Sequence, residues 1–209
     1  MFYHAAENRC AVDFGLLGLP ISEEEALGIL KSKGFEQIDV NVVAIAENLV
    51  GKAEWKWAAR SWDAPKYFDC SSLTMWIYAQ RGIEIPRRSI QQFEFCRKQG
   101  EGVRRDDLLL RGDLIFITSP YFNGKLVGDH SGIGHVCLHV GKGNVICATN
   151  SEFGTGVVNL SFHELFHTRK ICGVGRVIPG GSNVITLKTP PHREIKTSDD
   201  IKHIILQTL

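Results

Sequence analysis

The sequence predicts an α+β protein in which several helices are followed by an antiparallel sheet. In the first half of the chain, apolar residues recur at helical spacing. From about residue 107 the pattern changes to short runs rich in β-branched residues, which is typical of strands. Two of these runs flank Gly141-Lys142-Gly143, and a turn of this kind favours a hairpin. Helices and strands that are segregated along the chain are characteristic of the α+β class.

Four helices are expected before the sheet. Ser22 and Glu25 form a capping-box signature, so a short helix should begin there and end at Gly34. The other three are expected from apolar spacing at residues 41–51, at residues 70–82 and from Ser89 onward. Strands are expected at residues 114–117, 135–140, 144–149, 157–160 and 173–178, with a short helix at 162–167 and a long loop at 119–134.

Three segments are expected along the 209 residues. Residues 1–38 are interpreted as an N-terminal extension and residues 39–180 as the main domain, which ends at a Pro-Gly-Gly turn. Residues 181–209 are interpreted as a C-terminal tail. The tail carries Pro190-Pro191 and a polar stretch, so we expect it to be mobile, with its isoleucines available for docking.

Composition excludes several classes of function. The chain is 44% hydrophobic and 22% charged, as in ordinary globular proteins. Its net charge of +1 gives no bulk attraction to nucleic acid or to anionic membranes. No apolar run approaches the ~18 residues of a membrane span, and the N-terminus lacks the pattern of a signal peptide. We therefore expect a cytoplasmic location, no nucleic-acid partner and no membrane span.

The six cysteines are far apart in the sequence, with no CxxC spacing that indicates zinc binding or a thioredoxin-like site. We expect reduced thiols, no metal and no cofactor. One cysteine stands out because of its position. Cys70 lies at the expected start of a helix, where unpaired amides and the helix dipole favour a thiolate. Cys70 is therefore a candidate nucleophile, the alternative being an ordinary buried thiol.

A nucleophilic thiol needs a base, and eight histidines are available. His135 and His139 both lie on the first strand of the expected hairpin, and periodicity alone does not choose between them. Position favours His135, because it opens the strand, whereas His139 is next to the turn. Folding the hairpin about Lys142 puts Thr149 opposite His135 and Cys147 diagonal to it. Neither is an ideal group for orienting an imidazole.

Four motifs, in order, give residues 42–178 a resemblance to the NlpC/P60 family of cell-wall cysteine peptidases. Phe68-Asp69-Cys70-Ser71-Ser72-Leu73 resembles the nucleophile motif FDCSGL of that family, with Ser72 in place of glycine. The other three are Ile85-Pro86-Arg87-Arg88-Ser89 with Gln92, resembling LPRTSxxQ; Arg111-Gly112-Asp113-Leu114-Ile115-Phe116, resembling PGDLVFF; and Gly134-His135-Val136-Cys137-Leu138-His139-Val140-Gly141-Lys142-Gly143, resembling SHVGIYVGNG.

The resemblance implies a papain-like core, with a nucleophile helix packed on an antiparallel sheet. It implies that Cys70 is the nucleophile and His135 the base. The third catalytic position of the family, often His, Asn or Gln, is Cys147 here. A tyrosine that often precedes the nucleophile is replaced by Trp55 or Trp57. The substrate-binding residues that we expect on this basis are Asp69, Ser71, Ser72, Trp55 and Arg87, although Asp69 is equally well interpreted as a helix cap and Arg87 as a structural charge.

The function implied by the resemblance is hydrolysis of amide bonds in peptidoglycan stem peptides, including D-γ-glutamyl bonds. The partner would be a peptidoglycan peptide or muropeptide, reached in the cytoplasm or at the cell wall by another route. Two alternatives remain open. Cys147 at the orienting position is compatible with a weakly active or silent binding module on the same fold. The same thiol chemistry would also serve an amidase or acyltransferase with a different substrate.

Overall fold

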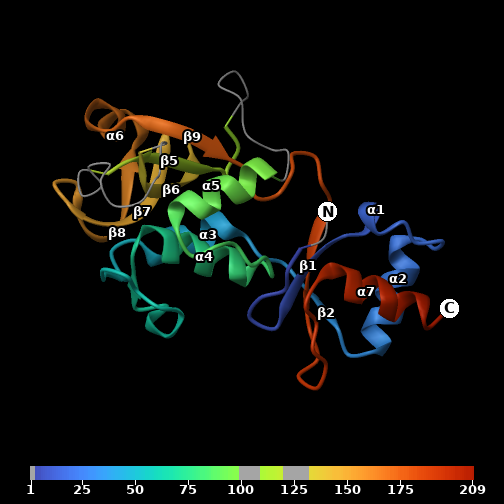
Figure 1. Cartoon of the computed structure of the whole chain (residues 1–209). Coiled ribbons are helices and arrows are strands. Elements are labelled where there is room, and N and C mark those ends of the chain that lie inside the picture. Colours follow the sequence, from blue (N-terminus) through green and yellow to red (C-terminus); the bar gives the residue numbers. More distant parts are fainter. Residues whose placement is uncertain (1–2, 99–108, 120–131) are drawn as a thin grey trace. The chain divides into compact units, whose positions relative to one another are not determined.

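The computed structural model describes residues 3–98, 109–119 and 132–209, and most of the loop expected at 119–134 lies outside them. The chain divides into two compact units, each built from segments that are distant in the sequence (Figure 1). The larger unit consists of Val42–Ile77 and Ile85–Val177, and the smaller one of Met1–Asn41, Tyr78–Glu84 and Ile178–Leu209. None of the helices in the described residues is long and apolar enough to cross a membrane.

The larger unit is built on a five-stranded sheet in the order β8-β7-β6-β5-β9, with every neighbouring pair antiparallel. The hairpin expected around Lys142 is present, because β6 pairs with β7 and Leu138 lies opposite Ile146. The mixed helical and antiparallel architecture confirms the predicted α+β class. The strands are β5 (Leu114–Thr118), β6 (Ile133–Gly141), β7 (Asn144–Ser151), β8 (Gly154–Ser161) and β9 (Ile171–Gly175).

Both faces of this sheet are covered. Phe116 packs edge-on against Phe93 of α5, which contacts β6 and β9. Ile115 and Ile117, which alternate with Phe116, belong instead to a buried cluster that includes Leu165 of α6. Cys137 and Cys147 belong to this second cluster. The helices are α3 (Val42–Leu49), α4 (Cys70–Gln80), α5 (Ser89–Lys98) and α6 (Phe162–Thr168), all close to the expected positions (Figure 1).

A short parallel pair, not expected from the sequence, leads into α4. It consists of β3 (Glu54–Trp55) and β4 (Tyr67–Phe68), with the turn η1 (Ser61–Asp63) between them. The segment before β3 is fixed to β8, because the Val157 amide donates to Ala53 O at 3.0 Å. At Gly156, φ is +103° and a β-carbon would lie 2.7 Å from Ala53 O, so only glycine fits there. The pair thus fixes the direction in which the chain enters α4.

The smaller unit corrects the interpretation of the two chain ends as a separate extension and a mobile tail. Its sheet has the order β1-β10-β2, so a strand from the C-terminal segment lies between two from the N-terminal segment. Helix α7 buries Ile201, Ile204 and Ile205 in the core that also contains Leu30 of α2. The capping box of α2 is present as predicted. The elements are β1 (Arg9–Asp13), α1 (Phe14–Leu17), α2 (Glu23–Ser32), β2 (Glu36–Ile38), β10 (Val184–Lys188) and α7 (Ser198–Leu206).

Candidate active site

Cys70 is the first residue of α4, and the residues around it cap the helix. The Asp69 carboxylate accepts a hydrogen bond from the Ser72 amide at 2.8 Å, and the Ser72 hydroxyl accepts one from the Asp69 amide at 2.9 Å. This is a reciprocal capping arrangement. The first intrahelical bond runs from the Leu73 amide to Asp69 O at 3.0 Å, so the amides of Cys70 and Ser71 precede it. Cys70 therefore lies at the positive end of the helix dipole.

Ser72, which stands where the family motif has glycine, is only 3% exposed. Its hydroxyl accepts from the Asp69 amide and donates to Asp69 O at 3.1 Å. This serine therefore acts in the cap, and the expectation that it binds substrate has no support in these contacts.

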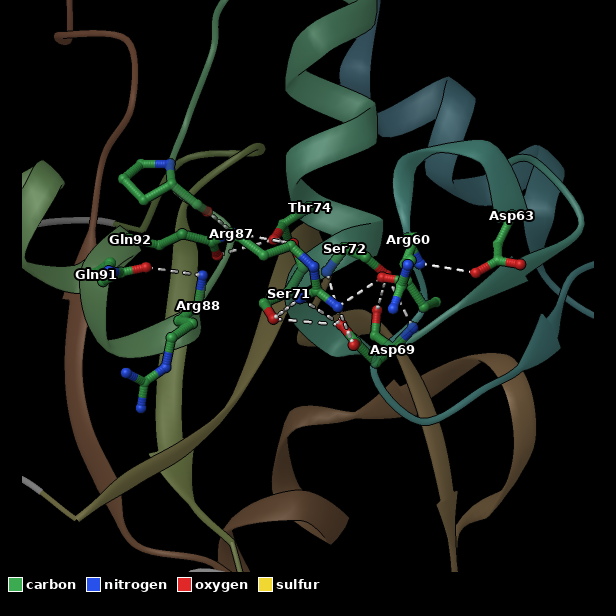
Figure 2. Close-up of polar contacts among 12 residues, drawn as sticks. Arg60, Asp63, Asp69, Ser71, Ser72, Thr74, Arg87, Arg88, Gln91 and Gln92 are labelled. Carbon is green, nitrogen blue, oxygen red and sulfur yellow. Dashed lines mark hydrogen bonds and ion pairs between the residues drawn. The ribbon is translucent and has the colours of Figure 1, made fainter. Parts of the chain in front are cut away.

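Arg87 is bound to the same cap (Figure 2). Its guanidinium pairs with the Asp69 carboxylate, donates to the Ser71 hydroxyl at 2.8 Å and donates to Ala59 O at 2.6 Å. The Asp69 side chain is 14% exposed and that of Arg87 is 36% exposed. The neighbouring Arg88 points away from this network in Figure 2, and its backbone amide donates to Gln91. The contacts thus give Arg87 a structural function, and its expected contact with a substrate carboxylate stays a prediction.

Gln92 connects the second motif to the first. This residue is fully buried, and its amide group donates to Ser71 O at 2.9 Å and to Pro86 O at 2.8 Å. Its carbonyl oxygen accepts from the Thr74 hydroxyl at 2.9 Å. A buried carboxamide with these three bonds is well satisfied, and it holds α5 against the first turn of α4.

The third motif also has a structural function. Asp113 is 1% exposed, and its carboxylate accepts two hydrogen bonds from the Arg176 guanidinium, at 2.8 and 2.9 Å. It also accepts from the Leu110 amide at 2.8 Å. His139, the alternative base, is buried with Nδ1 2.9 Å from Leu110 O. His139 is therefore a structural histidine, as its position beside the turn indicated.

His135 of β6 lies between two sulfur atoms. Its ring hydrogen bonds to Cys70, at the start of α4, and to Cys147, on β7. The predicted nucleophile, the predicted base and the residue at the third position are thus contiguous, as the hairpin register indicated for Cys147. Cys137, two residues beyond His135, hydrogen bonds to Cys147. Sequence reasoning missed Cys137, although its spacing from His135 places both side chains on one face of the strand.

The pKa values of His135 and Cys147 are shifted by their neighbours. Burial disfavours the imidazolium and lowers the pKa of His135, whereas negative charge on Cys70 and Cys147, together with hydrogen bonds to both, raises it. The net effect is a pKa of His135 well above the ordinary value, because the half-buried ring keeps access to the cavity and is hydrogen-bonded to both cysteines. The hydrogen bond from Cys137, followed by the charge of His135, lowers the pKa of Cys147 against the effect of burial.

These groups line a cavity with a volume of about 80 Å³. Trp55 and Asp69, which the sequence predicted as substrate-binding residues, line it together with Cys70, His135 and Cys147. Ser71, Ser72 and Arg87 are not among its lining residues. Arg169 and Asn150 also line the cavity, and no motif in the sequence indicated them. Nucleophilic catalysis by cysteine needs a thiol and a base in contact at a cavity, and Cys70 and His135 meet that requirement.

Comparison with known proteins decides the family. The model of the NlpC/P60 family matches residues 52–175, more than half of the chain. The chain belongs to the NlpC/P60 family. The match covers Cys70, His135 and Cys147, and it begins within the larger unit and ends there.

Three similar proteins illustrate the relationship. A "Probable endopeptidase p60" of Listeria seeligeri is 32% identical over 136 residues, which is 65% of this chain and 22% of the relative. A "Gamma-D-glutamyl-L-lysine dipeptidyl-peptidase" of Bacillus cereus is 33% identical over 94 residues, covering 45% of this chain and 25% of the relative. The solved structure of NlpC2 from Trichomonas vaginalis has a TM-score of 0.50 at 23% identity, over 65% of this chain and 44% of that one. This likeness supports the papain-like NlpC/P60 fold, and the chain spans about a quarter of the length of the two curated relatives.

Proposed function

We propose that the larger unit is a thiol hydrolase that cleaves amide bonds in peptidoglycan stem peptides. The observation that carries the proposal is the contact between Cys70 and His135 in one cavity. Two of the relatives described above are named as peptidases, one of them for a γ-D-glutamyl-L-lysine bond. Those names support a stem-peptide substrate, with a D-γ-glutamyl bond as the first bond to test.

The reaction begins when the proton of the Cys70 thiol passes to His135 and the sulfur attacks the amide carbonyl. The amides of Cys70 and Ser71, which precede the first intrahelical bond, stabilise the oxyanion. The His135 imidazolium donates its proton to the leaving amine, which gives a thioester on Cys70 and the free amine. His135 then removes a proton from water, the hydroxide attacks the thioester, and the acid product leaves as Cys70 is restored.

Cys147 acts in this scheme by orienting His135. A thiolate accepts a hydrogen bond from the imidazolium, and Cys137 supports the thiolate with a bond of its own. This pair of cysteines replaces the carboxamide or imidazole that the family resemblance led us to expect. Asp69 and Ser71 are bonded to Arg87, so a free amine of the substrate would share the Asp69 carboxylate with that guanidinium.

A silent binding module is the second candidate, and Cys147 at the orienting position is the observation that favours it. Mass spectrometry of defined muropeptides, before and after incubation with the protein, separates the two. We expect wild type to convert a stem peptide to two fragments that together exceed it by one water. Cys70→Ala and His135→Ala should form no fragments, whereas Cys172→Ala, at another partly exposed cysteine, should retain activity. Fragments formed by Cys70→Ala at the wild-type rate would refute the hydrolase, and a wild type that binds muropeptides without cleaving them or acyl esters would establish the binding module.

A further inference from the structure

Three side chains with metal-binding atoms meet on one face of the β6–β7 hairpin. One ring nitrogen of His135 and the sulfur atoms of Cys137 and Cys147 all lie within 4.8 Å of one another. His135 and Cys137 are two residues apart on β6, and the register of Leu138 with Ile146 places Cys147 opposite Cys137. Cys137 and Cys147 are ten residues apart in the sequence, and the hairpin brings them together. We propose that these three residues bind a soft transition-metal cation, with Zn²⁺ as the representative case.

The distances suit such an ion. Zinc–sulfur bonds of ~2.3 Å and zinc–nitrogen bonds of ~2.0 Å put tetrahedral ligand atoms roughly 3.6–3.8 Å apart. Since the separations here are at most 4.8 Å, closing the site requires shifts of roughly 1 Å, which side-chain rotation can supply. The strands that carry the ligands belong to one sheet, so the three positions are held before the metal arrives.

The chemistry of the ligand set selects the class of metal. Two thiolates and an imidazole are soft or borderline ligands, which prefer Zn²⁺ or Cu⁺ to Mg²⁺ or Ca²⁺. Cys137 and Cys147 are 0% and 1% exposed, so the bonds form in surroundings of low dielectric constant. The cavity beside His135 and Cys147 has room for a water molecule as the fourth ligand. Three protein ligands with one open position form a common zinc geometry.

Metal binding and hydrolysis compete for His135. His135 hydrogen bonds to both Cys70 and Cys147. Because each imidazole nitrogen has one in-plane bonding direction, we assign one sulfur partner to each nitrogen. A metal on the nitrogen facing Cys147 leaves the proton on the nitrogen facing Cys70. The imidazole then has no lone pair with which to accept a proton from Cys70 or from water. The cation would therefore inhibit the enzyme, and this consequence alone rests on the proposed hydrolase function.

Titration of the reduced, full-length protein with Co²⁺ tests the site without reference to activity. We expect one equivalent to produce thiolate-to-cobalt charge-transfer absorption and the visible bands of tetrahedral coordination, and Zn²⁺ to abolish both. Cys137→Ser should weaken binding at least tenfold, whereas Cys172→Ser should not. Cys70→Ala should keep the bands, because Cys70 faces the other nitrogen. Cobalt bound at the exposed pair His163 and His167, whose Nε2 atoms are 3.0 Å apart, would lack the thiolate band.

Absence of the thiolate band in wild type, or equal affinity in Cys137→Ser, would overturn the metal site. Loss of the band in Cys70→Ala would overturn the assigned ligand set. If the protein cleaves muropeptides, Zn²⁺ should inhibit wild type at a concentration at least tenfold lower than it inhibits Cys137→Ser. If the protein shows the cobalt bands but cleaves no muropeptide, the metal site stands and the proposed hydrolase function fails. If it cleaves muropeptides but shows no thiolate band, the hydrolase stands and the metal site fails.

Discussion

Replacement of Arg87 by alanine tests whether the second motif supports the nucleophile helix. The change removes the ion pair with Asp69 and the hydrogen bonds to Ser71 and Ala59. A hydrogen bond to a charged group contributes about 1.5–3 kcal/mol when buried, but an exposed ion pair contributes less than about 1 kcal/mol. Arg87 is 36% exposed, and Asp69 keeps its bond from the Ser72 amide, so we expect a total loss of about 2–3 kcal/mol.

Calorimetry measures this loss as a decrease of roughly 5–10 °C in the melting temperature of the larger unit. Arg88→Ala is the matched control, because it removes the same side chain one residue away from the network, and it should change stability by less than about 0.5 kcal/mol. Arg87→Lys should fall between the two, since lysine keeps the charge but not the planar fork. We also expect Arg87→Ala to reduce the turnover number at least tenfold by loosening the position of Cys70. Equal melting temperatures for Arg87→Ala and Arg88→Ala would refute the structural role.

Three further predictions concern pH and glycine. His135 has a raised pKa, so it is present as the imidazolium below that pKa and becomes neutral as the pH rises through it. Because the imidazolium protonates the leaving amine, the alkaline limb of kcat/KM should lie well above pH ~6.5. Cys147→Ser should move this limb to lower pH, and an unmoved limb in pH–rate profiles would contradict the assignment. Gly156→Ala should destabilise the protein by about 2–3 kcal/mol in urea melts, against about 1 kcal/mol for Gly143→Ala, where a β-carbon meets no atom within 4 Å. Gly28→Ala, at an exposed helical position, should stabilise by about 0.5–1 kcal/mol, and a lower urea midpoint would contradict this.

Local signals in the sequence predicted helix α2 of the smaller unit and most of the elements in the larger unit. The capping residues before α2, the apolar spacing of α4 and the glycine-flanked turn at Lys142 each act within a few residues, so they are legible without tertiary information. The hairpin register expected from the sequence likewise placed Cys147 beside His135. The assignment of motif residues as substrate contacts stays a prediction. Ser72 and Arg87 follow the family pattern, but their contacts are with the cap of α4.

Long-range pairing was beyond such reasoning. Strand β10 pairs with β1 and β2, which are more than a hundred residues away in the sequence. Neither β1 nor β2 shows the strong alternation of apolar and polar residues that would identify it as a strand. The sequence analysis noted that the C-terminal isoleucines could dock. Whether they form a docked helix depends on the core that the N-terminal segment supplies, which the local sequence does not reveal. Cys137 was missed for a different reason: a small apolar residue in a strand is normally core, and its contact with Cys147 appears only when two strands are aligned.

Alkylation of Cys70 in wild type and in His135→Ala tests the central claim, that the imidazole of His135 activates the Cys70 sulfur as a nucleophile. The protein is treated briefly with iodoacetamide at neutral pH, and the labelled cysteines are located by peptide mass spectrometry. We predict that Cys70 is labelled before the other five cysteines in wild type, and at least tenfold more slowly in His135→Ala. Equal labelling rates in the two proteins would contradict the account.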